Sequence, residues 1–544
     1  MRSARLNTLR PERFLAIFTG IMAVINLISA VTPALIDRLQ ILEEIIPMQV
    51  RSGTRLATAL AGFALILLAS GIWRSKRAAW WITLILLILS TITHVVKGLD
   101  FEEASVSLLL VFGLLLFRRR FVAHSDAPTI QRGLRTLGIA LGFTLLYGTI
   151  GFVQLDKHFS VKFNLWQAAY QTIRMFTEFS NPGLIITTRI GKYFTDSIYV
   201  IGAVTLSYAL LTLLAPVLLR QPTEPGELKQ ATDIVQKYGQ TVLARFCLFP
   251  DKKYFFSAGG SLIAYTYSNL TAVVLGDPVG PATDTLTIVK EFQKFCTRND
   301  WMLTFYQTRP DTLEAYHQAG LHEIKIGEEA VVDLANFSLK GGEVKSLRTS
   351  VNKLERLGYS CPISQPPHDE KFLDELKTVS DEWMLGRKGK EMKFSLGWFD
   401  RDYLNTTLIQ YAADPEGRVV AFANLVDEYQ NRELAVDLMR QKRELPAGTM
   451  DYLFVNLLLE AQKRGYERFN LGLSGLAGVG ELKSDPAVER AMHYIYANVT
   501  LAYNFKGLHS FKEKFNPTWL PRYLIYPNLT VLPVIALAVN EVGG

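Results

Sequence analysis

Long apolar runs in the first 220 residues limit the possible folds of this chain more than any other feature. Six runs stand out, at residues 14–31, 56–73, 78–96, 104–117, 134–153 and 198–219. Most reach the roughly 20 residues that an α-helix needs to cross a bilayer, although the fourth is shorter, at about 14. A signal peptide is the alternative for the first run, but no convincing small-residue cleavage site follows it. We therefore predict an N-terminal helical transmembrane bundle of about six spans over residues 1–220.

The charges between the runs predict how this bundle is oriented. Basic residues cluster after the second and fourth runs, and acidic residues lie between the other pairs; they are Arg74, Lys76, Arg77, Arg118, Arg119, Arg120, Arg132 and Arg135 against Glu43, Glu44, Asp100, Glu102 and Glu103. Because basic loops stay on the cytoplasmic side, both ends of the bundle are expected to be cytoplasmic. The prediction is a multi-pass protein of the plasma membrane with a cytoplasmic C-terminal domain.

The segment from 156 to 196 does not fit a simple span. It is long, aromatic and lightly charged, with Trp166, Tyr170 and Phe176 preceding a turn signal at 181–183. It could form a re-entrant or interfacial hairpin beside a lipid-accessible cavity. It could equally be an extracytoplasmic loop packed over the bundle.

Composition changes sharply after residue 220, so the overall hydrophobic share of 49% averages two unlike parts. A chain of 544 residues is also too long for one core. The three cysteines, Cys247, Cys296 and Cys361, are far apart and lack the paired spacing of metal ligands. We predict no metal site and no cofactor.

The second part of the chain alternates strand-like and helix-like segments. The strand-like segments are 254–257, 262–267, 272–275, 301–307, 419–427, 433–439 and 467–473, and the helix-like segments are 284–298, 343–357, 369–385 and 449–464. Hairpins and helices thus recur in a similar order over about 150 residues. We predict two similar α+β subdomains side by side, over 221–365 and 366–544.

The stretch from 502 to 522 combines aromatic and basic residues. As a strand, it would place Phe511, Glu513 and Phe515 on one face and Lys512 and Lys514 on the other. Two ammonium groups ringed by aromatic residues could bind a phosphate. The alternative is an aromatic strand packed on a core, with its lysines in solvent.

Several segments together resemble the aminoacyl-phosphatidylglycerol synthases, the multiple peptide resistance factor family of bacterial membrane proteins. In chain order they read KYFF (253–256), LGDPVGP (275–281), KIGEEA (325–330), SLR (346–348), FSLG (394–397), AFAN (421–424), DLMR (437–440), AGTMD (447–451), LGL (471–473) and AYNFKGLHSFKEKF (502–515). The resemblance implies two tandem acetyltransferase-like (GNAT) folds. They would transfer an aminoacyl group, with lysine expected, from aminoacyl-tRNA to phosphatidylglycerol.

The implied product makes the membrane surface less negative and the cell less sensitive to cationic antimicrobial peptides. The implied partners are aminoacyl-tRNA, phosphatidylglycerol or a related lipid, and the bilayer, and the chain could form a homo-oligomer. Family members often carry a larger membrane part that flips the product, so a six-span version leaves flipping in doubt. The sequence does not distinguish lysine from alanine, arginine or ornithine.

Residues within these motifs are candidates for the reaction. An aminoacyl ester is already activated, so transfer needs positioning and charge stabilisation more than a covalent nucleophile. We predict Asp437, Arg440 and Lys512 as catalytic residues, although a structural Asp437–Arg440 ion pair is the alternative. The predicted substrate-binding residues are Glu329, Asn424, Gly448 and Lys514, with Lys514 less important than Lys512. The predicted phosphate contacts to tRNA lie on the basic helix near 343–357 and are Lys345, Arg348, Lys353 and Arg356.

Two other functions compete with this interpretation. An acyl-CoA-dependent acyltransferase places a glycine-rich loop at a helix N-terminus to bind the pyrophosphate. The corresponding loop here, RELPAGT at 443–449, lacks the second glycine, which argues against coenzyme A. A membrane lipid transporter or flippase with a regulatory soluble domain is the non-enzymatic alternative.

Overall fold

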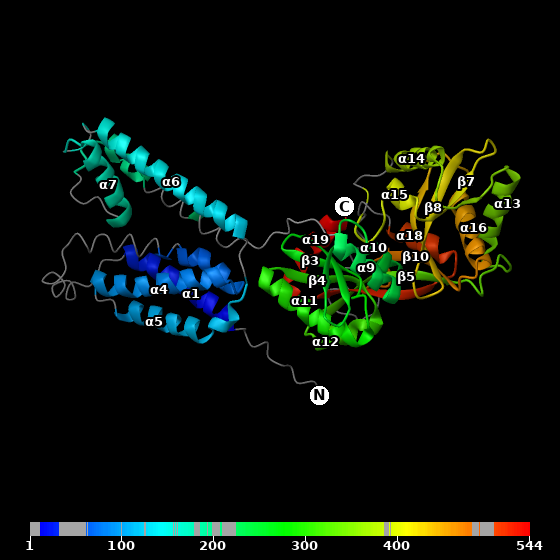
Figure 1. Cartoon of the computed structure of the whole chain (residues 1–544), viewed down its shortest axis with the longest axis horizontal. Coiled ribbons are helices and arrows are strands. Elements are labelled where there is room, and N and C mark those ends of the chain that lie inside the picture. Colours follow the sequence, from blue (N-terminus) through cyan, green and yellow to red (C-terminus); the bar gives the residue numbers. More distant parts are fainter. Residues whose placement is uncertain are drawn as a thin grey trace. The chain divides into compact units, whose positions relative to one another are not determined.

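A computed structural model shows the fold of the chain (Figure 1). It describes residues 11–31, 61–62, 64–98, 101–123, 127–155, 157, 159, 161–178, 185–192, 194–198, 207–208, 225–385, 391, 393–480, 489 and 505–543. The chain divides into two compact units. The first contains residues 1–219 with 297–301, and the second contains residues 220–296 and 302–544.

The first unit is helical in the residues described. Its named helices are α1 (Pro11–Val31), α4 (Arg77–Gly98), α5 (Phe101–Leu116), α6 (Ala127–Gln154) and α7 (Leu165–Glu178), with a short 3₁₀ turn at Arg118–Arg120. Two described helices, at Pro11–Ser29 and Arg77–Val95, are long and apolar enough to cross a membrane. The predicted second, fourth and fifth runs are helical where described, and most of the run at 198–219 lies outside the described residues. The number of spans therefore stays a prediction.

Helix α7 occupies the middle of the ambiguous 156–196 segment. One side packs on α6 through buried Ala168 and Met175, beside Phe152 of α6. The other side exposes Trp166 and Tyr170, with 86% and 62% of their surface accessible. Both interpretations of this segment can contain such an amphipathic helix, so the choice between them stays a prediction.

The second unit is built on one mixed sheet of eleven strands, ordered β1-β2-β3-β4-β11-β5-β10-β9-β8-β7-β6. The strands are β1 (Lys253–Phe256), β2 (Leu262–Ser268), β3 (Thr271–Leu275), β4 (Met302–Thr308), β5 (His322–Asp333), β6 (Ile363–Ser364), β7 (Leu408–Ala413), β8 (Val419–Asp427), β9 (Glu433–Gln441), β10 (Arg468–Gly475) and β11 (Thr518–Tyr526). The helices are α9 (Pro225–Tyr238), α10 (Val242–Phe246), α11 (Thr285–Asn299), α12 (Leu313–Gln318), α13 (Lys345–Arg356), α14 (Glu370–Leu385), α15 (Arg401–Leu404), α16 (Thr449–Lys463), α18 (Phe505–Glu513) and α19 (Leu532–Gly543).

Each half of the sheet contains the same strand–helix–strand crossover. In the first half, antiparallel β1–β3 lead through α11 to β4, which runs parallel to β3. In the second half, antiparallel β6–β9 lead through α16 to β10, which runs parallel to β9. Antiparallel strands that continue through a helix into a parallel strand are the arrangement of a GNAT-like fold. The predicted GNAT-like C-terminal domain is confirmed at this level.

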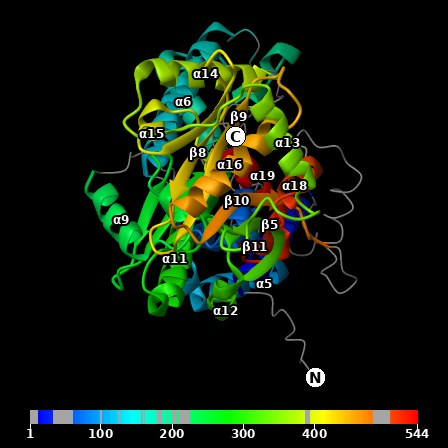
Figure 2. The same ribbon diagram turned by 90° about the vertical axis from the view of Figure 1, so that its right-hand side faces the viewer.

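Two of the hydrophobic cores in this unit lie on opposite faces of the sheet. One contains α13 and α16, with Leu347, Leu354 and Leu457 packed on strands of the second half (Figure 2). The other contains α9 and α10 on strands β1–β3 and reaches Val426 and Ala435 of the second half. Because this second core contains residues of both halves, the two halves form one continuous folded unit.

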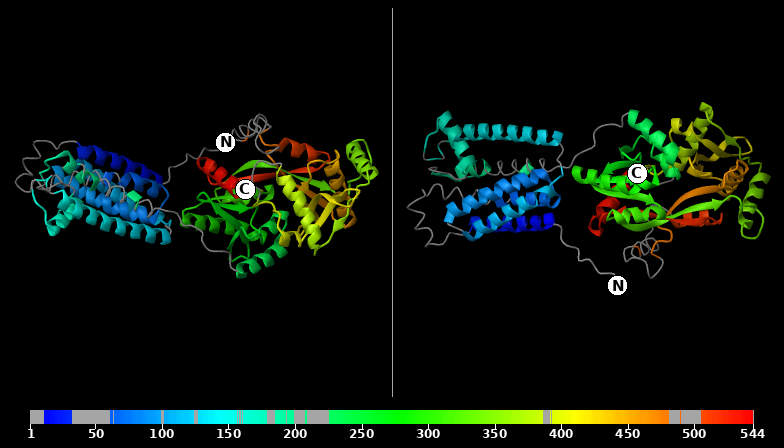
Figure 3. Two further views of the ribbon diagram at one scale, coloured as in Figure 1. Left: turned by 90° about the horizontal axis from the view of Figure 1, so that it is seen from above. Right: turned by 60° about the horizontal axis from the view of Figure 1, so that its bottom comes forward.

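The C-terminal segment does not stay with the second half. Strand β11 pairs on one side with β4 and on the other with β5. Helix α19 then packs on β2, β3 and β4, and the late part of the chain can be followed back toward the first half in Figure 3. A chain division at residue 365 therefore leaves β11 and α19 beside strands that precede it.

The prediction of a strand over the 502–515 stretch is wrong. Its described part is helix α18, followed by a tight turn before β11. Phe511 and Phe515 stand four residues apart, and both rings contact Phe454 of α16. Residues four apart lie on one side of a helix, so this spacing lets both aromatic rings pack on the same core.

Candidate active site

The two crossovers differ in how far their parallel strands stay together. Strands β3 and β4 pair along Thr271–Leu275, the whole length of β3. Strands β9 and β10 pair only over Glu433–Ala435 and Arg468–Asn470, although β9 continues to Gln441 and β10 to Gly475. We call these separated ends the β9/β10 divergence. The backbone groups along it have no partners from the neighbouring parallel strand, so it can receive side chains or a ligand.

Asp437 lies on β9 within the divergence. Its carboxylate accepts the Gly397 N–H at 2.9 Å and the Tyr403 hydroxyl at 2.6 Å. Burial raises the pKa of Asp437, and these hydrogen bonds oppose that shift. Two donors from the 394–403 segment therefore fix a buried carboxylate at the divergence.

Among the described residues, Arg440 forms an ion pair with Glu391 and not with Asp437, the partner in the alternative interpretation. One of its guanidinium nitrogens contacts Glu391 Oε1 at 2.7 Å, and the guanidinium carbon lies 4.0 Å from the centre of the Trp383 ring. Glu391 also accepts the Phe399 N–H. Arg440 is thus stacked on an aromatic ring and, through Glu391, tied to the same segment that holds Asp437.

Lys512 reaches the divergence from α18. Its ammonium donates to the carbonyl oxygens of Gly472 and Leu473 at 2.8 and 2.9 Å, on the part of β10 that has left β9. Only 2% of the residue is exposed. Burial lowers the pKa of Lys512 to about 7, while the Glu329 carboxylate acts in the opposite direction. A lysine of this kind can change its charge near neutral pH.

Lys514 serves a different place, so the predicted pairing of Lys512 and Lys514 around one phosphate is wrong. The Lys514 ammonium contacts Asp451 at 2.9 Å in the first turn of α16, and Ser350 donates to the same carboxylate. Lys512 lies in the last turn of α18 and Lys514 lies in the turn after it, so the two side chains do not share the single face that a strand would give them.

The start of α16 is already filled by the chain itself. Gly448 has a φ of +98°, and a Cβ there would lie 2.6 Å from Ser350 Oγ. The Asp451 carboxylate lies in the first turn, where a phosphate would otherwise bind. This helix start therefore presents a negative charge rather than a site for pyrophosphate.

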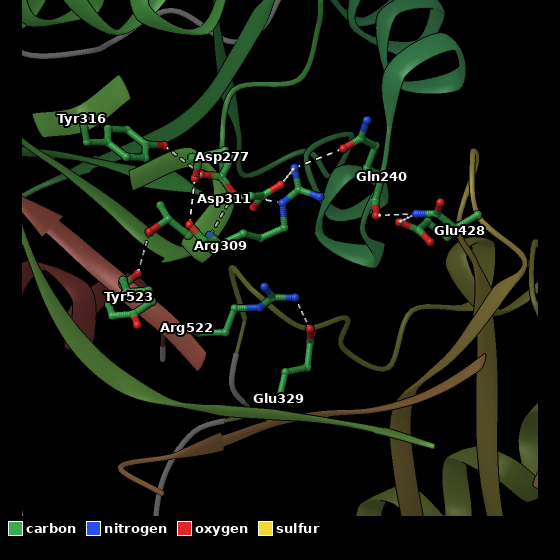
Figure 4. Close-up of polar contacts among 12 residues, drawn as sticks. Gln240, Asp277, Arg309, Asp311, Tyr316, Glu329, Glu428, Arg522 and Tyr523 are labelled. Carbon is green, nitrogen blue, oxygen red and sulfur yellow. Dashed lines mark hydrogen bonds and ion pairs between the residues drawn. The ribbon is translucent and has the colours of Figure 1, made fainter. Parts of the chain in front are cut away.

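Glu329 lies on β5 and forms a buried ion pair with Arg522 of β11 (Figure 4). The strand registers place the Glu329 side chain on the same sheet face as Asn470, Glu433 and Asp437. Glu433 accepts the Asn470 amide at 2.9 Å, and burial raises its pKa. Polar groups of β5, β10 and β9 thus line one face of the sheet.

A fourth carboxylate, Glu428, follows the end of β8. Burial and the neighbouring Glu433 carboxylate raise the pKa of Glu428 to about 7. Its Oε1 accepts a hydrogen bond from Asn431, which also donates to the Gln240 carbonyl (Figure 4). The acidic groups favour a positively charged ligand group at this face.

Asn424 has an internal role. It is fully buried, its Oδ1 accepts the Leu438 N–H at 2.8 Å, and its amide nitrogen lies 3.5 Å from Thr407. The hydrogen bond supports the irregular pairing of β8 and β9 around Asp437. Its predicted contact with substrate stays a prediction.

The predicted basic helix is confirmed as α13, but its four cations differ. Arg348 donates to the carbonyls of Leu339 and Gly341, and Lys353 donates to the Ala447 carbonyl. Lys345 and Arg356 are exposed. Arg348 therefore stabilises the preceding loop, while Lys345, Lys353 and Arg356 are exposed, and their contact with tRNA stays a prediction.

Sequence reasoning missed the partners that hold these candidates. Tyr403, Glu391, Trp383 and Arg522 are separated from Asp437, Arg440 and Glu329 by tens of residues or more. One signal was available, because Arg522 is the last residue of the aromatic and basic stretch at 502–522 and belongs to a strand neighbouring the KIGEEA motif.

The fold and site together define a protein with a transmembrane region and a tandem GNAT-like domain whose second crossover is open. Comparison with known proteins identifies the family. Residues 232–526 match the family described as "Phosphatidylglycerol lysyltransferase, C-terminal", and residues 10–155 match "Transmembrane region of lysyl-tRNA synthetase". The chain belongs to the phosphatidylglycerol lysyltransferase family, which confirms the resemblance found in the sequence.

Individual relatives agree with this assignment. A phosphatidylglycerol lysyltransferase of Bacillus subtilis is 32% identical over 474 residues, covering 82% of this chain and 55% of the relative. One from Staphylococcus epidermidis is 32% identical over 466 residues, covering 85% and 52%. The chain thus spans about half the length of these curated relatives. A solved structure of L-PGS from Bacillus licheniformis matches with a TM-score of 0.54 and 37% identity, covering 60% of this chain and 98% of that one.

Proposed function

We propose that this protein transfers a lysyl group from lysyl-tRNA to phosphatidylglycerol in the bacterial plasma membrane. The observation that carries the proposal is the β9/β10 divergence, lined by Asp437 and Lys512, in a chain of this family. In the reaction, a lipid hydroxyl oxygen forms a bond to the lysyl carbonyl carbon, and the bond from that carbon to the ribose oxygen breaks. The proton of the lipid hydroxyl ends on the ribose oxygen.

Lys512 is the candidate for moving this proton. With a pKa of about 7, a fraction of the amine is neutral at physiological pH and can accept a proton from the lipid hydroxyl. The resulting ammonium can then donate to the departing ribose oxygen. The phosphate-binding role is less compatible with the burial of Lys512 and its two carbonyl partners.

Asp437 and Arg440 are proposed to determine where the acyl group of the substrate lies and to stabilise the charge that develops on it. Asp437 holds Tyr403 and the Gly397 N–H, so it fixes the 394–403 segment beside the divergence. Arg440, held by Glu391 and Trp383, supplies a fixed positive charge that can stabilise a developing oxyanion. Glu428 and Glu433, whose pKa values are raised by burial, would gain charge when an ammonium group of a lysyl substrate lies beside them. Glu329, in contrast, is already paired with Arg522.

The acyl-CoA alternative fits less well. Its pyrophosphate would need the start of α16, where Asp451, Lys514 and Ser350 already contact one another. Gly448 is packed against Ser350 and leaves little room for a closely approaching phosphate. Transfer from aminoacyl-tRNA needs no such cradle.

We also propose a topology of about six spans with both ends cytoplasmic, and membrane and soluble domains meeting near residue 220. The basic loops after the second and fourth apolar runs support this orientation. Within the soluble part, subdomains at 221–365 and 366–544 describe the chain order, with β11 and α19 returning to the first. Protease digestion of the soluble part in inside-out vesicles, with protection in right-side-out vesicles, is expected; the reverse pattern would contradict the topology.

The proposed reaction is tested with full-length protein in nanodiscs. Radiolabelled lysyl-tRNA and phosphatidylglycerol are expected to give labelled lipid, whose added lysine makes an anionic headgroup cationic. Matched reactions contain free lysine, alanyl-tRNA or acetyl-CoA as donor, and discs without phosphatidylglycerol. Labelled lipid from acetyl-CoA alone, or none from any aminoacyl-tRNA, would refute the proposal.

A further inference from the structure

An aromatic stack lies beside the candidate active site and has no part in the reaction described above. The rings of His509 and Trp519 are nearly parallel, with an interplanar angle of 9° and centroids 4.3 Å apart. Both residues are half-buried. The Trp519 indole N–H donates to Glu513 at 2.8 Å, so the edge of the indole is fixed.

The position of this stack relates it to the divergence. His509 lies three residues before Lys512 on α18, whose ammonium contacts the carbonyls of Gly472 and Leu473. Trp519 lies on β11 as the register partner of Ala330, and the same strand carries Arg522, which binds Glu329. Both elements that build the stack therefore also carry residues that reach the candidate active site.

The surroundings of the stack suit an anionic polymer. Trp519 and Phe511 pack on the same core as α13 and α16, so α13, α16 and α18 belong to one side of the sheet (Figure 2). Lys345 and Arg356 are exposed on α13. Aromatic rings for bases and cations for phosphates are the combination that binds single-stranded nucleic acid.

We propose that an unpaired base at the 3′ end of the tRNA stacks on the outer face of the His509 ring. A parallel two-ring stack can be extended by a third ring. The Trp519 ring lies on the inner side of His509, and its hydrogen bond to Glu513 holds the indole in place. The base at this position would place the aminoacyl ester near Lys512. This inference rests on the proposed function for the identity of the RNA.

The experiment compares His509→Ala with His509→Phe in the full-length protein in nanodiscs. The first probe is fluorescently labelled, uncharged lysine tRNA with its complete CCA end, and the second is the same tRNA without its last two nucleotides. His509→Ala is expected to raise the Kd of the complete tRNA about 5- to 150-fold, the range for losing one base stack. His509→Phe is expected to bind it nearly as well as the wild type does.

The chain offers a matched control in a second pair of rings, His322 and Tyr526. These rings are 5.9 Å apart and tilted by 36°, and His322 is exposed. His322→Ala is expected to leave the Kd of the complete tRNA unchanged. With the shortened tRNA, His509→Ala and the wild type are expected to bind equally, and thermal midpoints report whether either variant is misfolded.

Three results would overturn the inference. They are unchanged binding by His509→Ala, an equal loss for complete and shortened tRNA, and an effect confined to the KM for phosphatidylglycerol, which would assign the ring to the lipid headgroup. Failure of the proposed function looks different, because the wild type would then form no lysyl lipid. A CCA-dependent difference between the variants would support base stacking even in that case.

Discussion

Each half of the sheet contains a strand–helix–strand crossover, but the two crossovers differ in how far their parallel strands stay paired. In the first half, β3 and β4 stay paired along the whole of β3, whereas in the second half β9 and β10 separate after three residues each. The paired crossover leaves its neighbouring backbone groups satisfied. The separated one exposes carbonyls that Lys512 binds. The two crossovers therefore differ in the feature on which the proposed reaction depends.

Two buried aspartates make this difference testable. Asp277 follows β3, and its carboxylate accepts the Arg309 N–H and the hydroxyls of Thr312 and Tyr316 (Figure 4). Asp437 has a similar set, with one backbone N–H and one tyrosine hydroxyl. Burial raises the pKa of both carboxyls. They differ chiefly in which crossover they adjoin.

The largest effect is expected from Asp437→Asn compared with Asp277→Asn. Loss of a preorganised group at a reaction centre typically lowers kcat about 100- to 1000-fold, and we expect this for Asp437→Asn. Both variants are expected to lower the thermal midpoint by similar amounts. Asp277→Asn is expected to leave kcat within about threefold of the wild-type value, since no proposed reacting group lies near Asp277. Lysyl transfer and thermal unfolding are measured on the same samples. Equal loss of kcat in both variants would remove the distinction between the halves.

A pH profile sharpens the role of Lys512. As a proton acceptor the amine must be neutral, so kcat is expected to rise with pH through about 7. Lys512→Arg stays charged and is expected to lose this rise together with most activity. Transfer rates from pH 5.5 to 9 check this, with buffer controls for hydrolysis of the lysyl-tRNA ester. A wild-type profile without an inflection near 7 would argue against proton transfer by Lys512.

The same lysine predicts how stability depends on pH. Its folded pKa is lowered to about 7 from an ordinary value of 10.5, so between these values the unfolded chain binds more protons. The free energy of unfolding should therefore increase as pH rises from about 7 to about 10. Lys512→Met is expected to reduce this slope. Thermal midpoints across the window test it, and equal slopes for variant and wild type would contradict the lowered pKa.

A smaller effect is expected at the start of α16. Gly448→Ala adds a left-handed backbone strain and a clash with Ser350, and should cost about 1–3 kcal/mol of unfolding free energy. Gly417→Ala is the matched control, since its φ is +82° but no atom lies within 4 Å of the added Cβ. Denaturation of both variants separates strain from crowding. Equal costs would show that the helix start is less filled than the contacts with Ser350 indicate.

The smallest effects are expected on the surface of α13. Lys345→Gln with Arg356→Gln should weaken tRNA binding a few-fold and reduce its salt dependence, since each lost phosphate contact releases fewer counterions. Lys290 and Lys294, exposed on α11 of the first half, provide the matched pair of glutamine substitutions. Kd values at several salt concentrations give the slopes. The same change in both pairs would indicate a general effect of net charge.

Local patterns predicted the regular elements well. Helices α13 and α16 lie within about two residues of the expected ranges, because apolar residues recur at helical spacing and Gly465 follows α16. The strand predicted at 502–515 failed because Phe511 and Phe515 fit either a strand face or a helix face. Their common contact with Phe454 decides for the helix. Local sequence carries no record of such a partner.

The candidate residues could be chosen from the sequence, but their arrangement could not. Asp437, Arg440 and Lys512 do lie around one divergence or beside it. Their actual partners Tyr403, Glu391 and Gly472 come from segments 34 to 49 residues away. The prediction that Lys512 and Lys514 share one phosphate was wrong because it assumed a strand. A strand places residues two apart on the same face, and a helix does not.

The insertion of β11 between β4 and β5 has a consequence for biosynthesis. A ribosome finishes β4 and β5 more than 180 residues before it reaches β11, and until then these two strands lack the neighbour that joins them. Unpaired strand edges of this kind promote aggregation. The gap between β4 and β5 can be filled only once β11 has been synthesised, so a chain interrupted before Thr518 would expose both edges to proteases and chaperones. Closure of the first half thus depends on a strand that is translated long after the other strands of that half.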